Sequence, residues 1–232
     1  MYGWRGRIGL IIPADNAVME PEFHRLVPEG VSAHSARLKK CPRPEMPIEA
    51  LELVKTFNET KVNLIAYMCA ASSFVMGPKG NAELCDKLSE ITDGLPCVTA
   101  TTAMVDGLKA VGAKRVAVLS PHPPEIAEKL KEYLEESGFD IPCLVGLGLD
   151  IPAINNTSPG DIYRYVRAMD LSQADAIFIA ATNFRAIDVI EAIEADFGLP
   201  VVSSNQVVMW TALRKLGVAD KPHGFGRLWD YE

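Results

Sequence analysis

A chain of 232 residues that is 48% hydrophobic can bury a sizeable core, either as one α/β domain or as two units of about 110 residues. Its formal net charge of −7 argues against a nucleic-acid partner and against binding to an anionic membrane. The sequence contains no apolar run of about 18 residues, so we expect no membrane span. The first residues lead directly into a strand pattern without the cleavage region of a signal peptide.

The cysteine pattern favours a reducing compartment. The five cysteines are odd in number and form no C-x-x-C pair, which is typical neither of a disulfide framework nor of a zinc site. We therefore expect a cytoplasmic protein. No Gly-rich phosphate loop follows any predicted strand, and no His, Asp or Glu cluster has metal-ligand spacing. The sequence thus predicts no nucleotide, metal or other cofactor.

The first half of the chain alternates strand and helix patterns. Strands are predicted over 7–13, 31–38, from Leu64 onward and over 97–99. Helices are predicted after Asn16 and over 47–57, 81–92 and 101–111.

The second half repeats this order. Strands are predicted over 114–120, 141–149, 175–181 and 201–203, with helices over 125–137, 159–169, 185–196 and 206–216, and an ordered tail over 224–229. The Gly-Leu-Pro breaker and short strand at 94–99 recur at 198–203. We therefore predict an α/β fold of two similar lobes, 1–112 and 113–232, each with a parallel sheet flanked by helices. A cleft separates the lobes, and the C-terminal tail is able to return to the first.

Cys69 ends the apolar run that starts at Leu64, and only small residues follow it. Parallel sheets bind ligands at the carboxyl ends of their strands, and small residues let backbone N–H groups approach a ligand. A lone cysteine is also often a buried core thiol. The repeat favours a place in the cleft, where we expect Cys69 to be the only thiol and the other cysteines (Cys41, Cys85, Cys97 and Cys143) to be structural.

The predicted cleft gathers the strand ends 13–16, 69–73, 120–122 and 181–183. We predict two catalytic residues, Cys69 and His122. The predicted substrate-binding residues are Pro13, Asn16, Ala70, Ala71, Ser72, Ser120, Ala181, Thr182 and Asn183. Backbone N–H groups at the helix starts expected after Cys69 and Ala181 suit a small carboxylate or an enediolate. As alternatives, Asn16, Ser120 and Thr182–Asn183 only cap helices, and His122 lies in a surface turn.

These residues resemble the aspartate/glutamate racemase superfamily, in particular its arylmalonate decarboxylase and maleate cis-trans isomerase branch. The likeness to the decarboxylases lies in 94–120, 200–204 and 226–230, and the likeness to the isomerases in 13–16, Met19–Glu20, 203–206 and Trp210. The resemblance implies two pseudo-symmetric lobes around a cleft, no cofactor and a small carboxylate or dicarboxylate substrate. It also implies a carbanion or enediolate intermediate, approached by cysteines from opposite faces. The sequence leaves the oligomeric state open.

The chain departs from the family at several site positions. Cys69 falls where isomerases and racemases carry their first cysteine and decarboxylases a glycine, whereas Ala181 replaces the second-lobe cysteine. His122 replaces a tyrosine that helps to bind a carboxylate, and Ala70 and Ala71 replace hydroxyl residues of the decarboxylase oxyanion pocket.

A single thiol disfavours two-base racemization, which needs a group on each face of the substrate, whereas decarboxylation needs only one proton donor. Our leading hypothesis is a cofactor-independent decarboxylase of malonate-type diacids in which Cys69 protonates the enediolate. The alternatives are a maleate isomerase-like enzyme with Cys69 as the nucleophile, and a non-catalytic dicarboxylate binder.

Overall fold

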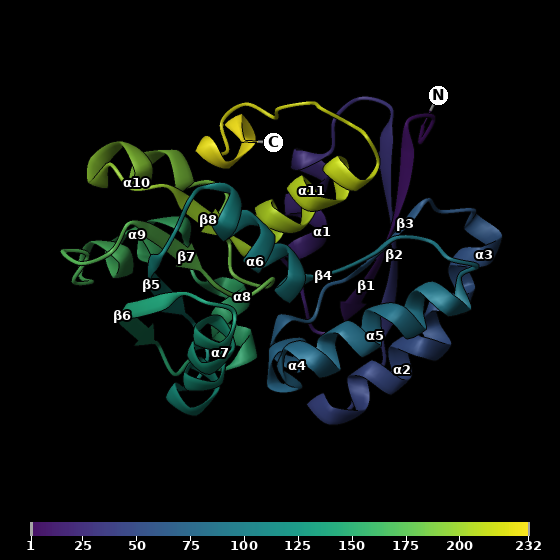
Figure 1. The fold of residues 1–232 in the computed structure, drawn as a ribbon, viewed down its shortest axis with the longest axis horizontal. Coiled ribbons are helices and arrows are strands. Elements are labelled where there is room, and N and C mark those ends of the chain that lie inside the picture. Colours follow the sequence, from purple (N-terminus) through teal and green to yellow (C-terminus); the bar gives the residue numbers. More distant parts are fainter. Residues whose placement is uncertain (1, 232) are drawn as a thin grey trace.

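Two four-stranded parallel sheets form the framework of the molecule, which is described here by a computed structural model of residues 2–231 (Figure 1). The first sheet has the order β2-β1-β3-β4, with β1 Gly6–Pro13, β2 Val31–Leu38, β3 Leu64–Tyr67 and β4 Cys97–Thr99. The second has the matching order β6-β5-β7-β8, with β5 Arg115–Ser120, β6 Asp140–Gly146, β7 Ala176–Ile179 and β8 Val201–Ser203. The predicted α/β fold with two parallel sheets is confirmed.

The central strands are apolar on both faces because helices cover both sides of each sheet. All four residues of β3 are buried, as are all four of β7. The helices are α1 Met19–Leu26, α2 Met46–Leu53, α3 Phe57–Thr60, α4 Ala70–Val75, α5 Gly77–Ile91, α6 Ala100–Ala110, α7 Pro124–Glu136, α8 Ile151–Asn156, α9 Pro159–Arg167, α10 Ile190–Phe197 and α11 Ser204–Lys215. Short 3₁₀ turns are η1 Arg43–Glu45, η2 Val54–Thr56 and η3 Arg227–Asp230.

Helices α6 and α11 occupy equivalent places in the repeat and pack against each other between the sheets (Figure 1). Each begins with a capping box, Thr99 with Thr102 and Ser203 with Gln206, which satisfies N–H groups at the helix start. Gly107 permits the close approach, because a Cβ there would lie 2.2 Å from the Val207 side chain. The repeat seen in the sequence is therefore also the seam that joins the two sheets.

The C-terminal segment closes mainly on the second sheet and its helices. Trp229 is buried, and the backbone N–H of Arg227 donates to Glu194 of α10 at 2.9 Å. Earlier in this segment, Asp220 accepts hydrogen bonds from Arg5, near the start of the chain. The C-terminal segment thus contacts both α10 and the start of the chain.

The structure differs from the predicted elements in three places. The helix predicted over 185–196 begins only at Ile190, because Ala181 has a φ of +80° and the chain then forms turns. The helix predicted over 47–57 is divided into α2, η2 and α3. Helix α8 was not predicted, although Asp150 caps it by accepting from the Ala153 N–H at 2.9 Å and Pro152 lies in its first turn.

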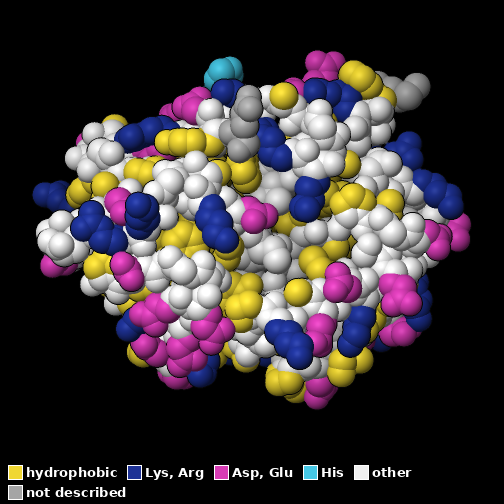
Figure 2. All heavy atoms as spheres, viewed as in Figure 1, with side chains coloured by type: hydrophobic (Ala, Val, Ile, Leu, Met, Phe, Trp, Pro, Cys, Tyr) yellow, Lys and Arg dark blue, Asp and Glu magenta, His cyan; other side chains and the backbone are white. Residues whose placement is uncertain are grey.

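The surface carries charges of both signs. Figure 2 shows acidic side chains gathered over α7, while the rest of that face mixes positive and negative groups. This face therefore offers no broad basic area for a polyanion. No helix in the described part of the chain is both long and apolar enough to cross a membrane.

Candidate active site

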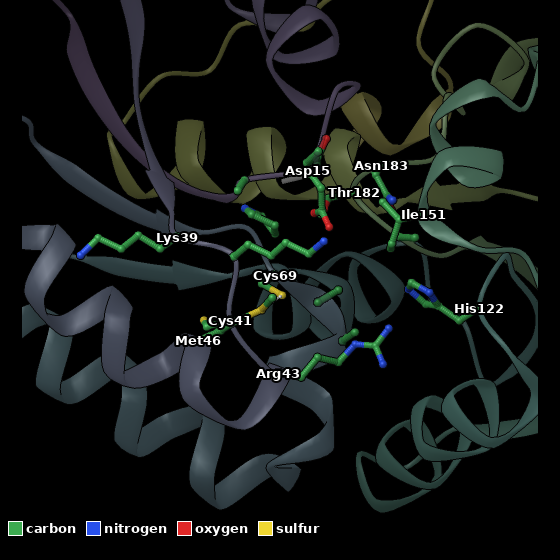
Figure 3. A pocket seen from close by; sticks show the side chains of 17 residues that line it. Asp15, Lys39, Cys41, Arg43, Met46, Cys69, His122, Ile151, Thr182 and Asn183 are labelled. Atoms are coloured by element: carbon green, nitrogen blue, oxygen red, sulfur yellow. Dashed lines mark hydrogen bonds between the residues drawn. The ribbon is translucent and has the colours of Figure 1, made fainter.

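A cavity of about 220 Å³ lies between the two sheets, at the carboxyl ends of their strands (Figure 3). The first lobe contributes Pro13, Ala14, Asp15, Asn16, Lys39, Lys40, Cys41, Arg43, Met46, Cys69, Ala70 and Ala71 to its wall. The second contributes His122, Ile151, Ala181, Thr182 and Asn183. Because the two parallel sheets point their strand ends toward the same space, residues far apart in the sequence meet here.

Cys69 is a buried thiol between β3 and α4, and only 7% of its surface is exposed. Its Sγ lies 3.5 Å from Met46 Sδ. Burial raises the pKa of Cys69, and hydrogen bonds from Ser72 and the positive charge of Arg43 offset this only in part. The thiol is therefore protonated at neutral pH and is suited to donate a proton.

Ala181 occupies the equivalent strand end of the second lobe, directly after β7 and Ala180, and brings no ionisable group to the cavity. Its neighbour Thr182 joins the two lobes: the hydroxyl donates to the Met68 carbonyl at 3.0 Å and accepts from Asn16 Nδ2 at 3.0 Å. Asn16 Oδ1 in turn accepts from the N–H groups of Val18 and Met19, both at 3.0 Å. Asn16 thus accepts hydrogen bonds from backbone N–H groups at the start of α1 and also lines the cavity.

His122 projects into the cavity from the loop after β5 (Figure 3). It is 6% exposed, and its Nδ1 has no hydrogen-bond partner within residues 2–231. Burial, with a smaller contribution from Arg43, lowers the pKa of His122 to about 4. The imidazole is consequently neutral at pH 7.

A buried carboxyl group supports the cavity from behind. Asn205 Nδ2 donates to Glu22 Oε2 at 2.7 Å and to the Thr182 carbonyl at 3.0 Å, and the Ile187 N–H donates to Glu22 Oε1 at 3.4 Å. Burial raises the pKa of Glu22 to about 7. This network fixes the backbone of the Ala181–Asn183 wall.

The structure places most of the predicted site residues in the cavity wall: Cys69, His122, Pro13, Asn16, Ala70, Ala71, Ala181, Thr182 and Asn183. Ser72 and Ser120 lie outside it. The Ser72 hydroxyl instead bonds to the Tyr67 hydroxyl at 2.6 Å and to the Cys69 carbonyl at 3.1 Å, and the Ser120 hydroxyl is buried without a partner in the described chain. The expectation that Thr182 and Asn183 start a helix was wrong, because α10 begins only at Ile190.

The prediction missed one whole side of the cavity. Lys39, Lys40, Cys41 and Arg43 follow β2, so the strand-end rule that located Cys69 also points to them. The expectation that Cys69 is the only thiol in the cleft was wrong, since Cys41 lines it too. Ile151 was missed together with α8. No cluster of three or more His, Cys, Asp or Glu suited to a metal ion occurs within residues 2–231.

The fold and this site define a two-lobed α/β protein with a buried cysteine in the cavity between its sheets. The model of the arylmalonate decarboxylase family matches residues 8–229, and the chain belongs to that family. The arylmalonate decarboxylase of Bordetella bronchiseptica is 29% identical, with 96% of each chain covered. The predicted resemblance to this branch of the aspartate/glutamate racemase superfamily is confirmed.

Solved structures agree with this assignment. A cysteine-to-alanine variant of the maleate isomerase Iso from Pseudomonas putida S16, solved with maleate, has a TM-score of 0.93 at 25% identity, over 97% of this chain and 98% of the other. An arylmalonate decarboxylase with one glycine-to-cysteine and one cysteine-to-serine substitution, in liganded form, has a TM-score of 0.81 at 27% identity, over 97% and 99%. The family therefore contains both isomerases and decarboxylases.

Proposed function

We propose that this protein is a cofactor-independent decarboxylase of malonate-type diacids, with Cys69 as the proton donor. The observation that carries the proposal is the asymmetry of the cavity. A buried, protonated thiol lies at the strand end of one lobe, and Ala181 without an ionisable group lies at the equivalent place in the other. Such a site holds one proton donor at a strand end, which is what decarboxylation needs.

In the proposed reaction, the bond between the malonate α-carbon and one carboxylate breaks, and CO₂ leaves. The bonding electron pair stays on the substrate as an enediolate. The α-carbon then takes the proton from Cys69, and the resulting thiolate recovers a proton from water. Because its pKa is raised, this recovery is favourable at neutral pH.

The retained carboxylate becomes the enediolate and needs hydrogen-bond donors. The first N–H groups of α4 that border the cavity, at Ala70 and Ala71, have no acceptor within the helix. Each donor of this kind contributes about 2.7–4 kcal/mol to an oxyanion in an enclosed site. The proposal assigns this task to the main chain, since both alanines lack hydroxyl groups. Thr182 and Asn183 add polar side chains on the opposite wall.

The likeness to a maleate-bound isomerase supports a second candidate, a maleate isomerase-like enzyme. There the Cys69 thiolate would add to the double bond of a cis-dicarboxylate. The raised pKa of Cys69 disfavours this route, because no general base in the described chain hydrogen-bonds to its Sγ. Mass spectrometry after mixing with maleate distinguishes the two, since only the isomerase route yields a succinyl group on Cys69.

Chiral analysis of the product tests the proposal. With a prochiral methyl(phenyl)malonate, protonation from the first-lobe side gives the enantiomer opposite to that formed by an arylmalonate decarboxylase that protonates from a second-lobe cysteine. The usual enantiomer in excess would contradict the role of Cys69. Stabilisation by malonates in a thermal shift assay without CO₂ release would instead indicate a non-catalytic dicarboxylate binder.

A further inference from the structure

The wall that the strand-end prediction missed is rich in positive charge. Of the residues that line the cavity, Lys39, Lys40 and Arg43 are cationic, and only Asp15 is acidic. All three cations follow β2: Lys39 and Lys40 lie in the loop, and Arg43 is the first residue of η1. In Figure 3, Asp15 lies with Thr182 and Asn183 on one side of the cavity, and Arg43 lies on the other side. The two walls therefore differ in charge.

Arg43 is a cation directed into the cavity. Its side chain points across the space toward His122, whereas the ammonium of Lys39 points away (Figure 3) and lies 3.7 Å from Glu49. Arg43 is half-buried, and within residues 2–231 its guanidinium has neither an ion pair nor a hydrogen bond. A partly desolvated guanidinium without a partner is costly, so its place at the wall is explained by an anion that it binds.

His122 supplies a second, independent observation at the same place. It is 94% buried, is neutral at pH 7, and its Nδ1 has no partner in the described chain. Burial raises the pKa of Cys69 and lowers that of His122, and the charge of Arg43 lowers both, so the guanidinium lies within electrostatic reach of each. A carboxylate between Arg43 and His122 would pair with the guanidinium and lie against the His122 ring where that ring lines the cavity.

The chemistry decides which carboxylate this is. A guanidinium paired with the departing carboxylate stabilises the reactant anion and opposes the loss of CO₂, in which that negative charge moves onto the enediolate. The retained carboxylate is assigned to the N–H groups that follow Cys69. The carboxylate at Arg43 therefore belongs to neither of the malonate groups.

We propose that Arg43 and His122 form a subsite for a third carboxylate, so that the substrate is a malonate whose substituent itself ends in a carboxylate. This inference rests on the proposed decarboxylase function and specifies its substrate class. Arg43 is then the residue that selects an acidic substituent over an aryl group.

Two malonates that differ only in the substituent test this specificity. Propane-1,2,2-tricarboxylate carries methyl and carboxymethyl groups, and methyl(phenyl)malonate carries methyl and phenyl groups. We would measure the binding of both by calorimetry to the Cys69→Ala protein, which lacks the proton donor. The tricarboxylate is expected to bind more tightly, and Arg43→Met is expected to weaken it about 10- to 100-fold while changing the phenyl compound less than about 2-fold.

Two further variants complete the set. Arg43→Lys keeps the charge without the bidentate fork and should restore part of the affinity. Lys39→Met removes a charge from the same segment and should change neither affinity more than about 2-fold, because its ammonium points away from the cavity. Equal weakening of both malonates by Arg43→Met, or a preference of the starting protein for the phenyl compound, would overturn the subsite.

A separate assay tests the proposed function. CO₂ release from either malonate is measured on the protein with Cys69 intact. If neither malonate is decarboxylated, the decarboxylase function fails, while the binding measurements still decide whether Arg43 recognises a carboxylate.

Discussion

The two lobes share one strand order but differ at the strand ends that face the cavity. In the first lobe β3 leads to Cys69 and directly into α4. In the second lobe β7 leads to Ala181, whose φ of +80° turns the chain aside, and α10 begins only at Ile190. The duplicated scaffold is preserved while the thiol and the helix start are present on one side only. Symmetry of the fold therefore does not carry over to the chemistry of the cavity.

The seam between the lobes shows the opposite behaviour. The capping boxes of α6 and α11 are matched, at Thr99 and Ser203, and the two helices pack together. Positions that hold the lobes together have kept the repeat, because both halves need the same helix starts and close contacts there. The differences gather where a ligand would lie.

Removing the first-lobe thiol should have the largest effect. Cys69→Ala is expected to lower the decarboxylation rate by about 10²–10⁴-fold, because the enediolate loses its proton donor. The measurement is CO₂ release from a malonate. Cys41→Ala is the matched control, since Cys41 also lines the cavity but follows β2 and is half-buried. A greater loss of decarboxylation rate in Cys41→Ala than in Cys69→Ala would mean that Cys41, and not Cys69, is the proton donor.

Restoring a thiol to the second lobe should reduce the asymmetry. Ala181→Cys places a proton donor opposite Cys69, so a prochiral malonate should give a product of clearly lower enantiomeric excess, measured by chiral chromatography. Ala181→Ser serves as the control, because it adds a similar volume without an acid of comparable pKa. An unchanged excess in Ala181→Cys would mean that position 181 does not face the α-carbon.

The buried Glu22 should make stability depend on pH. Its pKa is raised by burial from 4.5 to about 7, so the folded state holds a proton that the unfolded state releases. The contribution of protonated Glu22 to the free energy of unfolding is complete below pH 4.5 and is lost as the pH rises through 7. Relative to Glu22→Gln, the native protein should lose up to about 3 kcal/mol of unfolding free energy across this window, measured by urea unfolding.

Glu20 offers a control of opposite sign on the same helix. Burial acts to raise its pKa, but hydrogen bonds from Ser35 and Arg37 hold the pKa below 4.5. The stability that Glu20 provides is therefore present above pH 4.5 and lost as the pH falls below it. Parallel pH profiles for the native protein and Glu22→Gln would contradict the raised pKa of Glu22.

The smallest expected effect concerns the backbone at the second-lobe strand end. Ala181→Gly should raise the free energy of unfolding by up to about 1 kcal/mol, because glycine adopts a positive φ without the steric cost of a Cβ. Thermal melting measures the change. Ala180→Gly, one residue earlier and without a positive φ, should destabilise the protein instead. Destabilisation by both substitutions would show that the Ala181 methyl group contributes more through packing than it costs.

Much of the fold followed from local patterns in the sequence. Apolar runs marked the central strands β1, β3, β5 and β7 of the two sheets, and the recurring Gly-Leu-Pro breaker at 94–99 and 198–203 marked the repeat. These signals are local, because a strand buried on both faces must be apolar along its length. They also placed Cys69 and His122 at strand ends, and the structure brings both to one cavity.

Only the tertiary structure decided what surrounds Cys69. The sequence shows that Arg43 follows a strand, but not that its guanidinium turns inward while the Lys39 ammonium turns outward. Nor does it show that Ser72 and Ser120 are absent from the cavity wall, or that Glu22 meets Asn205. Side-chain direction and burial arise from contacts between distant segments, and these set the charge and proton state of the site. The sequence determined that there is a thiol at the end of β3, and the packing of the two lobes decided that this thiol is protonated and lies near the charge of Arg43.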